Sequence, residues 1–218
     1  MKHSSRRNIL MRGLAALGAG LVAMIPEARA AVAASRRQDV PWYAVKPVEQ
    51  IKLEGAERKA ALLRLIGRAD VQGLLPLPRS ARPEDQLAAV TGEDKAFAAR
   101  NLLPDGRWMT SYGVLLNDGR ALGAYVAEGG PARSELLLYA PSRTDADTFT
   151  LDRAVRNGAP LDLAAGFPPV CCELNRGQFA TCCGGCFFVC ATPPATLCVP
   201  CVLAYCAACY VVNCNRWC

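Results

Sequence analysis

Apolar residues recur at helical spacing in two segments in the middle of the chain. In residues 57–66 (ERKAALLRLI) they form one broad helical face, made of Leu62, Leu63, Leu65 and Ile66. Gly67 follows and is a typical helix stop, because glycine adopts the backbone conformations that end helices. A second helix is predicted to begin near Pro83, since proline suits a first helical turn and the acids Glu84 and Asp85 suit the positive end of the helix dipole.

Strand-like patterns follow these helices. Residues 108–116 and 121–127 are apolar runs on either side of residues 117–120 (Asn-Asp-Gly-Arg). This is a strong hairpin signal, because Asp-Gly tolerates the positive φ that tight turns require. Two more apolar runs, 134–139 and 148–155, are expected to extend the hairpin into a small antiparallel meander.

These patterns predict that residues 41–161 form an α+β domain, with its helices first and its antiparallel meander second. Residues 31–40 are small and polar, which indicates a flexible terminus of the mature chain. Residues 162–170 contain the glycine and prolines of a linker that resists regular structure and is open to proteases. We identify no nucleophile with a base in residues 41–161, so we expect a protein that is not an enzyme and has no catalytic residues.

Residues 171–218 have a different character, because no charged residue occurs from Gly177 to Asn215. Cysteines recur at helical spacing on both sides of Thr192-Pro193-Pro194, which predicts two cross-linked short helices in a small, mainly helical, disulfide-rich module. A module of this size cannot bury all its apolar side chains, so they require a partner surface or a bilayer. These side chains are Phe187, Phe188, Val189, Leu197, Val199, Val202, Leu203, Tyr205, Tyr210, Val211 and Val212.

The module carries all twelve cysteines of the chain: Cys171, Cys172, Cys182, Cys183, Cys186, Cys190, Cys198, Cys201, Cys206, Cys209, Cys214 and Cys218. We expect six disulfides, because a segment this short cannot fold by hydrophobic packing alone, whereas each bridge contributes about 2–4 kcal/mol. Neighbouring cysteines rarely bond each other, so each adjacent pair should reach two separate partners. The connectivity itself does not follow from the sequence.

Two other interpretations of the sulfurs stay open. Three CxxC units, Cys183–Cys186, Cys198–Cys201 and Cys206–Cys209, are the pairs that a tetrathiolate zinc site or an iron–sulfur cluster needs, although no run has the ferredoxin order. Cys198-Val199-Pro200-Cys201 also resembles a thioredoxin-type redox pair, but no strand–helix–strand pattern surrounds it. The disulfide interpretation involves no cofactor and no metal.

Residues 1–30 have the pattern of a secretory signal, with a basic head, a weakly apolar middle and the small residues Ala28 and Ala30 at a cleavage point. The run from Ser5 to Leu10 (SRRNIL) resembles the twin-arginine export signal, with Arg6 and Arg7 as the paired arginines. The alternative is an uncleaved membrane anchor, but the apolar stretch is well short of the about 20 residues that span a bilayer. We therefore expect a secreted protein, exported folded by the twin-arginine pathway.

Removal of this signal changes the charge balance. Residues 1–30 hold a net charge of +4 out of the formal +6, which leaves +2 on the rest of the chain. The basic character belongs mostly to the signal, so we expect no nucleic-acid partner. His3, the only histidine, also lies in the signal. A mature chain without it has no Ser-His-Asp or Cys-His mechanism and no Cys/His zinc site.

The order of a twin-arginine signal, a middle region and a cysteine-rich apolar end resembles that of the halocin C-eight-type bacteriocin precursors. The closing Cys214-Asn215-Arg216-Trp217-Cys218 is similar to the ending of that family, with a shorter spacer. The resemblance implies that the C-terminal peptide is released by proteolysis and is antimicrobial. It also implies that the portion before the peptide acts as an immunity factor that binds it.

The patterns and the resemblance together predict an exported bacteriocin-like precursor. Its residues 171–218 would act on a target cell membrane or envelope component, and residues 41–161 would mask them through an intramolecular contact. The main alternative is an exported protein that holds a metal or an iron–sulfur cluster on its cysteines. A further alternative is a secreted structural or adhesion protein whose cysteine-rich end is never cleaved.

Overall fold

A computed structural model of the chain describes residues 40–78, 80–129, 133–145, 147–163, 170–176, 182–191 and 197–218. Residues Pro41–Cys218 form one compact unit, which contains both the predicted middle domain and residues 171–218, hereafter the cysteine-rich segment. The expected export signal, with Arg6, Arg7, Ala28 and Ala30, lies outside the described residues. The Thr192-Pro193-Pro194 break lies outside them as well.

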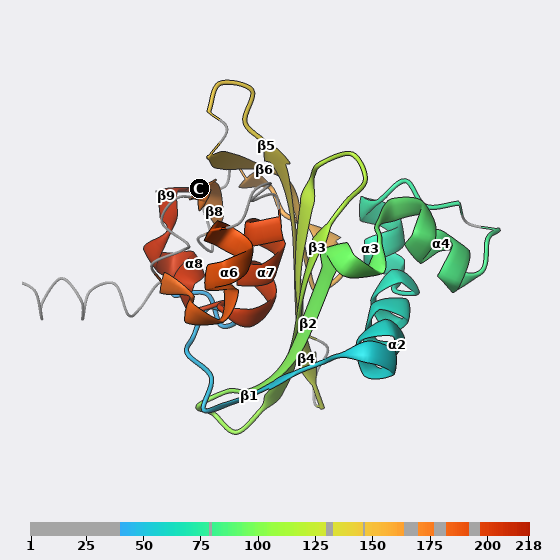
Figure 1. Cartoon of the computed structure of the whole chain (residues 1–218), viewed down its shortest axis with the longest axis horizontal. Coiled ribbons are helices and arrows are strands. Elements are labelled where there is room, and N and C mark those ends of the chain that lie inside the picture. The colour runs from blue at the N-terminus through green and yellow to red at the C-terminus, as the bar shows by residue number, and fades with distance from the viewer. Residues whose placement is uncertain are drawn as a thin grey trace, which may run out of the picture. The chain divides into compact units, whose positions relative to one another are not determined.

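The compact unit is built on one antiparallel sheet (Figure 1). Its strands follow the order β1-β2-β3-β4-β5-β6-β8-β9, and β7 pairs with β6 beside this path. The strands are β1 (Glu49–Lys52), β2 (Ala96–Leu102), β3 (Trp108–Leu115), β4 (Ala121–Glu128), β5 (Ser134–Pro141), β6 (Thr148–Arg156), β7 (Ala159–Pro160), β8 (Cys171–Asn175) and β9 (Cys214–Trp217).

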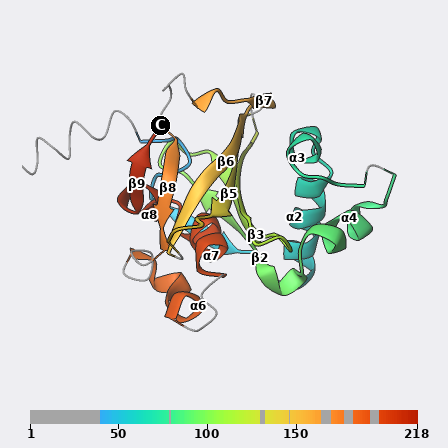
Figure 2. The same ribbon diagram turned by 90° about the horizontal axis from the view of Figure 1, so that it is seen from above.

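Helices cover both faces of this sheet, as the two views in Figures 1 and 2 show. One face carries α2 (Gly55–Ile66), α3 (Ala69–Leu74) and α4 (Pro83–Val90), with the short 3-10 helix η1 (Glu93–Lys95) leading into β2. Helices of the cysteine-rich segment lie on the other side: the 3-10 helix η3 (Gly184–Cys186), α6 (Phe187–Ala191), α7 (Cys198–Tyr205) and α8 (Cys209–Val212). Among these, α7 packs directly on β2, β3 and β4.

The alternation of side chains along β3 explains how one strand serves both faces, because successive residues of a strand point to opposite sides. Tyr112 and Val114 belong to the apolar cluster that α2 and α4 complete. Ser111 and Gly113, which alternate with them along the strand, face α7. The strand is buried from Met109 to its end, as a strand with helices on both faces must be.

Several local predictions are confirmed. The helix predicted over 57–66 is α2, the helix predicted near Pro83 is α4, and the predicted hairpin is the β3–β4 pair. Its turn contains Gly119 at a φ of 86°, a positive value that glycine adopts without strain. The runs at 134–139 and 148–155 lie in β5 and β6, which pair antiparallel as expected.

The predicted fold class is wrong. We expected the sheet to end within residues 41–161 and to be followed by a small, mainly helical module. Instead, β8 pairs with β6, and β9 pairs with β8, so the cysteine-rich segment supplies two strands of the same sheet. In addition, β1 precedes the helices and pairs with β2, and neither strand was predicted. Strand pairing depends on contacts between distant residues, which local periodicity does not contain.

Candidate functional site where the cysteine-rich segment meets the sheet

The contact between α7 and the sheet is centred on two glycines. Gly113 of β3 and Gly123 of β4 lie opposite each other in the strand register. A Cβ atom on Gly113 would overlap the carbonyl group of Pro200, and one on Gly123 would lie 3.3 Å from a methyl carbon of Leu203. The absence of side chains here lets the backbone of α7 lie against the sheet. We call Ser111, Gly113 and Gly123 the helix seat.

Polar side chains of the sheet bind the C-terminal end of α7. The last carbonyl groups of a helix have no partner within the helix. The Ser111 hydroxyl donates to the Ala204 carbonyl at 2.5 Å, and the Gln50 amide donates to the Tyr205 carbonyl at 2.8 Å. Asn101 joins the two donors, since it accepts a hydrogen bond from Gln50 and donates one to Ser111, both at 2.8 Å. The sheet therefore fixes where α7 ends as well as which face it buries.

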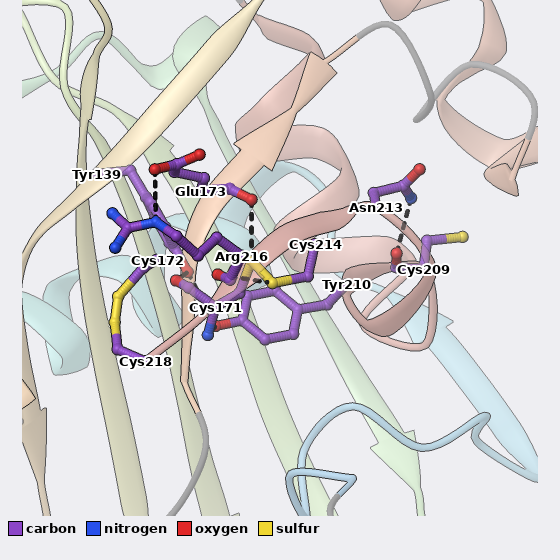
Figure 3. The surroundings of a disulfide bond; sticks show 10 residues. All are labelled: Tyr139, Cys171, Cys172, Glu173, Cys209, Tyr210, Asn213, Cys214, Arg216 and Cys218. Atoms are coloured by element: carbon purple, nitrogen blue, oxygen red, sulfur yellow. Dashed lines mark hydrogen bonds and ion pairs between the residues drawn. A yellow bond between two sulfur atoms is a disulfide. The ribbon is translucent and has the colours of Figure 1, made fainter. Parts of the chain in front are cut away.

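A second contact joins β5 to the start of β8 through two buried tyrosines (Figure 3). The Tyr139 hydroxyl donates to the Cys171 carbonyl at 2.9 Å, and the Cys171 amide donates to the Tyr210 hydroxyl at 2.8 Å. The two hydroxyls are 2.9 Å apart. Because the single Tyr139 proton already points to Cys171, the Tyr210 hydroxyl is the donor between them.

These phenols remain neutral at ordinary pH. Burial raises the pKa of Tyr210 to about 12 and raises the pKa values of Tyr139, Tyr43 and Tyr125 well above the usual value for tyrosine. The ring of Tyr43 stacks on that of Tyr125 with centroids 4.2 Å apart and meets Tyr210 edge to face at 5.6 Å. The cluster thus contains aromatic rings from the start of the unit, the sheet and the cysteine-rich segment.

The prediction of six disulfides is confirmed. The bridges are Cys171–Cys214, Cys172–Cys218, Cys182–Cys209, Cys183–Cys206, Cys186–Cys201 and Cys190–Cys198. Each adjacent pair reaches two separate partners, as expected. The last four bridges are nested one inside the next and join the η3–α6 region to α7 and α8, which we call the disulfide ladder. All six lie within the cysteine-rich segment.

The sheet covers much of the apolar surface that the sequence left without a partner. Every residue of α7 from Cys198 to Ala204 is buried, as is Tyr210. Phe188 and Val212 remain 81% and 67% exposed. No helix in the described part of the chain combines the length and apolar character needed to cross a bilayer. The second predicted helix is divided into α7 and α8, because α7 ends before Cys206, and α7 is buried against the sheet.

Sequence reasoning did not identify the residues of the sheet that form this contact. Ser111, Gly113 and Gly123 lay in predicted strands but were not singled out, and no partner was predicted for Asp147. In the structure the Asp147 carboxylate pairs with the Arg176 guanidinium, across the junction of β6 and β8. Two glycines inside strands that also have an apolar pattern were the available signal, since glycine in a strand often marks a close backbone approach.

Comparison of the chain with protein-family models, with curated proteins and with solved structures found no match. Function is therefore inferred from the chain's own chemistry.

Proposed function

We propose that the protein is an exported bacteriocin-like precursor, in which residues 41–161 mask the cysteine-rich segment until it is released as a membrane-active antimicrobial peptide. The observation that carries the proposal is the burial of α7 on the helix seat. Its sequence, Cys-Val-Pro-Cys-Val-Leu-Ala-Tyr, has no charged side chain. A free helix of this kind exposes apolar surface that favours a bilayer or a partner protein. Whatever covers α7 therefore controls what the segment can bind.

The covalent connections of the chain support release by one cut. Every disulfide lies within residues 171–218, and no cysteine occurs before Cys171. One cleavage between β7 and β8 would leave two chains held together only by noncovalent contacts. The released peptide would keep all six bridges, which restrict its unfolded state and so preserve a fixed shape without the sheet. The predicted linker, 162–170, lies in this interval.

Six disulfides indicate an oxidising, extracytoplasmic environment. Secretion by the twin-arginine pathway is part of the proposal, and the pattern around Arg6 and Arg7 supports it. A chain exported in the folded state would reach the outside with α7 already covered. The producing cell would then never meet the exposed peptide.

The alternatives fit the geometry less well. A mature metal or iron–sulfur protein needs free thiolates, whereas all twelve cysteines are paired in bridges. An uncleaved adhesion protein would have to dock through the few apolar side chains that the segment still exposes, such as Phe188 and Val212, because its apolar helix α7 is turned inward onto the sheet. Intact-mass measurement separates both from the proposal, because bridges remove hydrogens, metal adds mass, and cleavage yields two species.

The test uses the mature chain with a protease recognition sequence placed within residues 162–170. We expect the uncut protein to leave dye-loaded vesicles of anionic phospholipid intact. After the cut, a chain with Gly113→Ala, which disturbs the helix seat, should release the segment and cause vesicle leakage and growth inhibition of cells related to the producer. The matched control is a cut chain with Gly73→Ala, because a Cβ at Gly73 meets nothing within 4 Å; it should stay largely masked.

The proposal fails if the fully oxidised segment, purified from the cut Gly113→Ala chain, leaves both vesicles and cells unharmed. It also fails if the uncut chain is as active as the cut Gly113→Ala chain, because masking would then have no role. Recovery of only uncut mature chain from the producing culture would favour the adhesion alternative.

A further inference from the structure

We propose that the chain, before its bridges form, binds one zinc ion through Cys183, Cys186, Cys201 and Cys206. The sulfur atoms of Cys183, Cys186 and Cys206 all lie within 4.8 Å of one another. The fourth, that of Cys201, is bonded to the sulfur of Cys186. The four thiols are the two middle rungs of the disulfide ladder, Cys183–Cys206 and Cys186–Cys201, so folding alone brings them together.

The geometry is close to that of a tetrathiolate site. Zinc binds cysteine sulfur at about 2.3 Å in a tetrahedron, which places neighbouring sulfurs about 3.8 Å apart. Once reduced, the bonded partners Cys183 and Cys206, and likewise Cys186 and Cys201, must separate to about this distance, while sulfurs of different bridges, already within 4.8 Å for Cys183, Cys186 and Cys206, must approach by up to about 1 Å. Cys183, Cys186 and Cys201 are buried and Cys206 is half-buried, so the four thiols are shielded from bulk water. Burial of this kind is typical of a structural zinc site, which is closed by four protein ligands.

The local backbone suits metal ligation on both sides. Cys183-Gly184-Gly185-Cys186 forms a tight turn in which the Cys186 amide donates to the Cys183 carbonyl at 3.1 Å. This C-x-x-C spacing is common in structural zinc sites. Cys201 lies in α7, and Cys206 follows the last residue of that helix. The ion would thus join the turn to the end of α7, which is the link that the two bridges make after oxidation.

Residues 41–161 supply a positive charge beside this cluster of cysteines. Four thiolates around one Zn²⁺ carry a net charge of −2, and no charged residue occurs from Gly177 to Asn215 to balance it. The Lys52 ammonium, on β1, lies 3.5 Å from the position that a Cβ on Gly185 would take. It also lies over the Tyr205 ring at 4.8 Å. A nearby ammonium favours thiolates and hence metal binding.

A different set of ligands would be chosen from sequence alone. Cys198-x-x-Cys201 and Cys206-x-x-Cys209 form a more regular pair of motifs. In the fold, however, Cys198 is bonded to Cys190 and Cys209 to Cys182, on the innermost and outermost rungs of the ladder. Both ligand sets contain Cys201 and Cys206. The proposed site also uses Cys183 and Cys186, whereas the two sequence motifs would use Cys198 and Cys209, so these four residues distinguish the sets.

Zinc would hold the segment in place where disulfides do not persist. Thiols stay reduced in the cytosol, so a chain that folds there before export has no bridges to fix α7 against the sheet. This role rests on the proposed function, whereas zinc binding does not. Outside the cell, two molecules of a small disulfide would oxidise the four thiolates to two bridges, become four thiols by taking up four protons, and release Zn²⁺.

The experiment uses the full mature chain, reduced and kept without oxygen, with one equivalent of zinc. Thiols are alkylated with and without zinc, and protected cysteines are identified by peptide mass spectrometry. We expect zinc to protect Cys183, Cys186, Cys201 and Cys206. Cobalt in place of zinc should give the absorption bands of tetrahedral thiolate coordination, and oxidised glutathione should then release the metal and form the two middle bridges.

Two double variants of the reduced chain serve as a matched pair, since each removes one rung of the ladder. Cys183→Ser/Cys206→Ser should weaken zinc binding at least about 100-fold in competition with a chelator. Cys182→Ser/Cys209→Ser, which removes the neighbouring rung, should stay within about 3-fold of the unaltered chain. Protection of Cys198 and Cys209 in place of Cys183 and Cys186, protection spread over all cysteines, or equal weakening of both variants would overturn the proposal. A failure of antimicrobial activity would leave it untouched.

Discussion

The two faces of the sheet are covered in different ways. On one face, α2, α3 and α4 join residues such as Tyr112 and Leu122 in a single apolar cluster, which contains no cysteine. On the other face, α7 lies on two glycines and its last carbonyls accept hydrogen bonds from Ser111 and Gln50. The first contact rests on the volume of apolar side chains. The second rests on close backbone approach and on hydrogen bonds with defined directions.

This difference separates a permanent core from a specific docking contact. An apolar core tolerates changes that keep its volume, because many side-chain arrangements fill the same space. A contact between backbones has no such tolerance, since no rotamer change makes room for an added atom. In the proposed precursor, the helices on the first face stay with the sheet. The helices on the second face leave with the released segment.

The largest effect is expected from Gly113→Ala, because the added methyl group overlaps the Pro200 carbonyl and the backbone must move. The unfolding free energy of the oxidised chain should fall by about 3 kcal/mol or more. Hydrogen exchange should show opening of α7 before that of α2. Gly73→Ala is the control and should be neutral or stabilising, since alanine favours a helix by about 1 kcal/mol. Equal exchange in the two variants would remove the distinction between the faces.

Leu65→Ala tests the opposite face. Leu65 is buried in α2, so its truncation should cost about 2–5 kcal/mol by loss of apolar burial and creation of a cavity. Urea unfolding measures the loss. Here hydrogen exchange should first increase in α2 and α4, with α7 kept on the helix seat until the whole unit unfolds. Early exchange of α7 in this variant would show that the two faces are not independent.

An alkaline titration tests the tyrosine cluster. The pKa of Tyr210 in the folded protein, about 12, lies above its ordinary value near 10, so the folded state keeps a proton that the unfolded state loses. Its contribution to stability is fully present below about pH 10. As the pH rises toward 12, stability should fall by up to about 1.4 kcal/mol per pH unit for each such phenol. Urea midpoints measured from pH 8 to 12 should show this decline, and Tyr210→Phe should make it less steep by the share of one phenol, since Tyr139, Tyr43 and Tyr125 still contribute.

Tyr139→Phe tests the hydrogen bond between β5 and the start of β8. The variant leaves the buried Cys171 carbonyl without this donor, which should cost about 1–3 kcal/mol in the unfolding free energy. Tyr125→Phe is the matched control, because the buried Tyr125 hydroxyl has no hydrogen-bond partner among the described residues. Its removal should be neutral or slightly stabilising. A loss as large as that of Tyr139→Phe would mean that ring packing, and not the hydrogen bond, makes the contact.

The smallest effect is expected from Asp147→Asn at the junction of β6 and β8. The Asp147 carboxylate pairs with Arg176 but is about half exposed, so water and salt screen the attraction. The loss should be below about 1 kcal/mol and should vanish in high salt. The Arg176 amide still donates to the Asp147 carbonyl at 2.6 Å, which the substitution leaves in place. A loss that persists in high salt would contradict the electrostatic explanation.

The sequence by itself predicted local structure and the complete pairing of the cysteines. The apolar spacing of residues 57–66 predicted α2, Pro83 with its following acids predicted α4, and Asp118-Gly119 predicted the β3–β4 turn, because each signal lies within a few neighbouring residues. The even number of cysteines in a short apolar segment predicted that all of them pair. Small segments need cross-links to fold, whichever partners they choose.

Tertiary structure decided the rest. Residues 96–102 form a central strand covered on both sides, so they lack the clean alternation that identifies a strand. β8 and β9 join the sheet, and the twelve cysteines select one pairing among many, through contacts between residues that are far apart in the chain. The helix seat also depends on contacts between residues that are far apart in the chain. Gly113 and Gly123 have a purpose only once their strands pair in register and a helix from the other end of the chain lies across them.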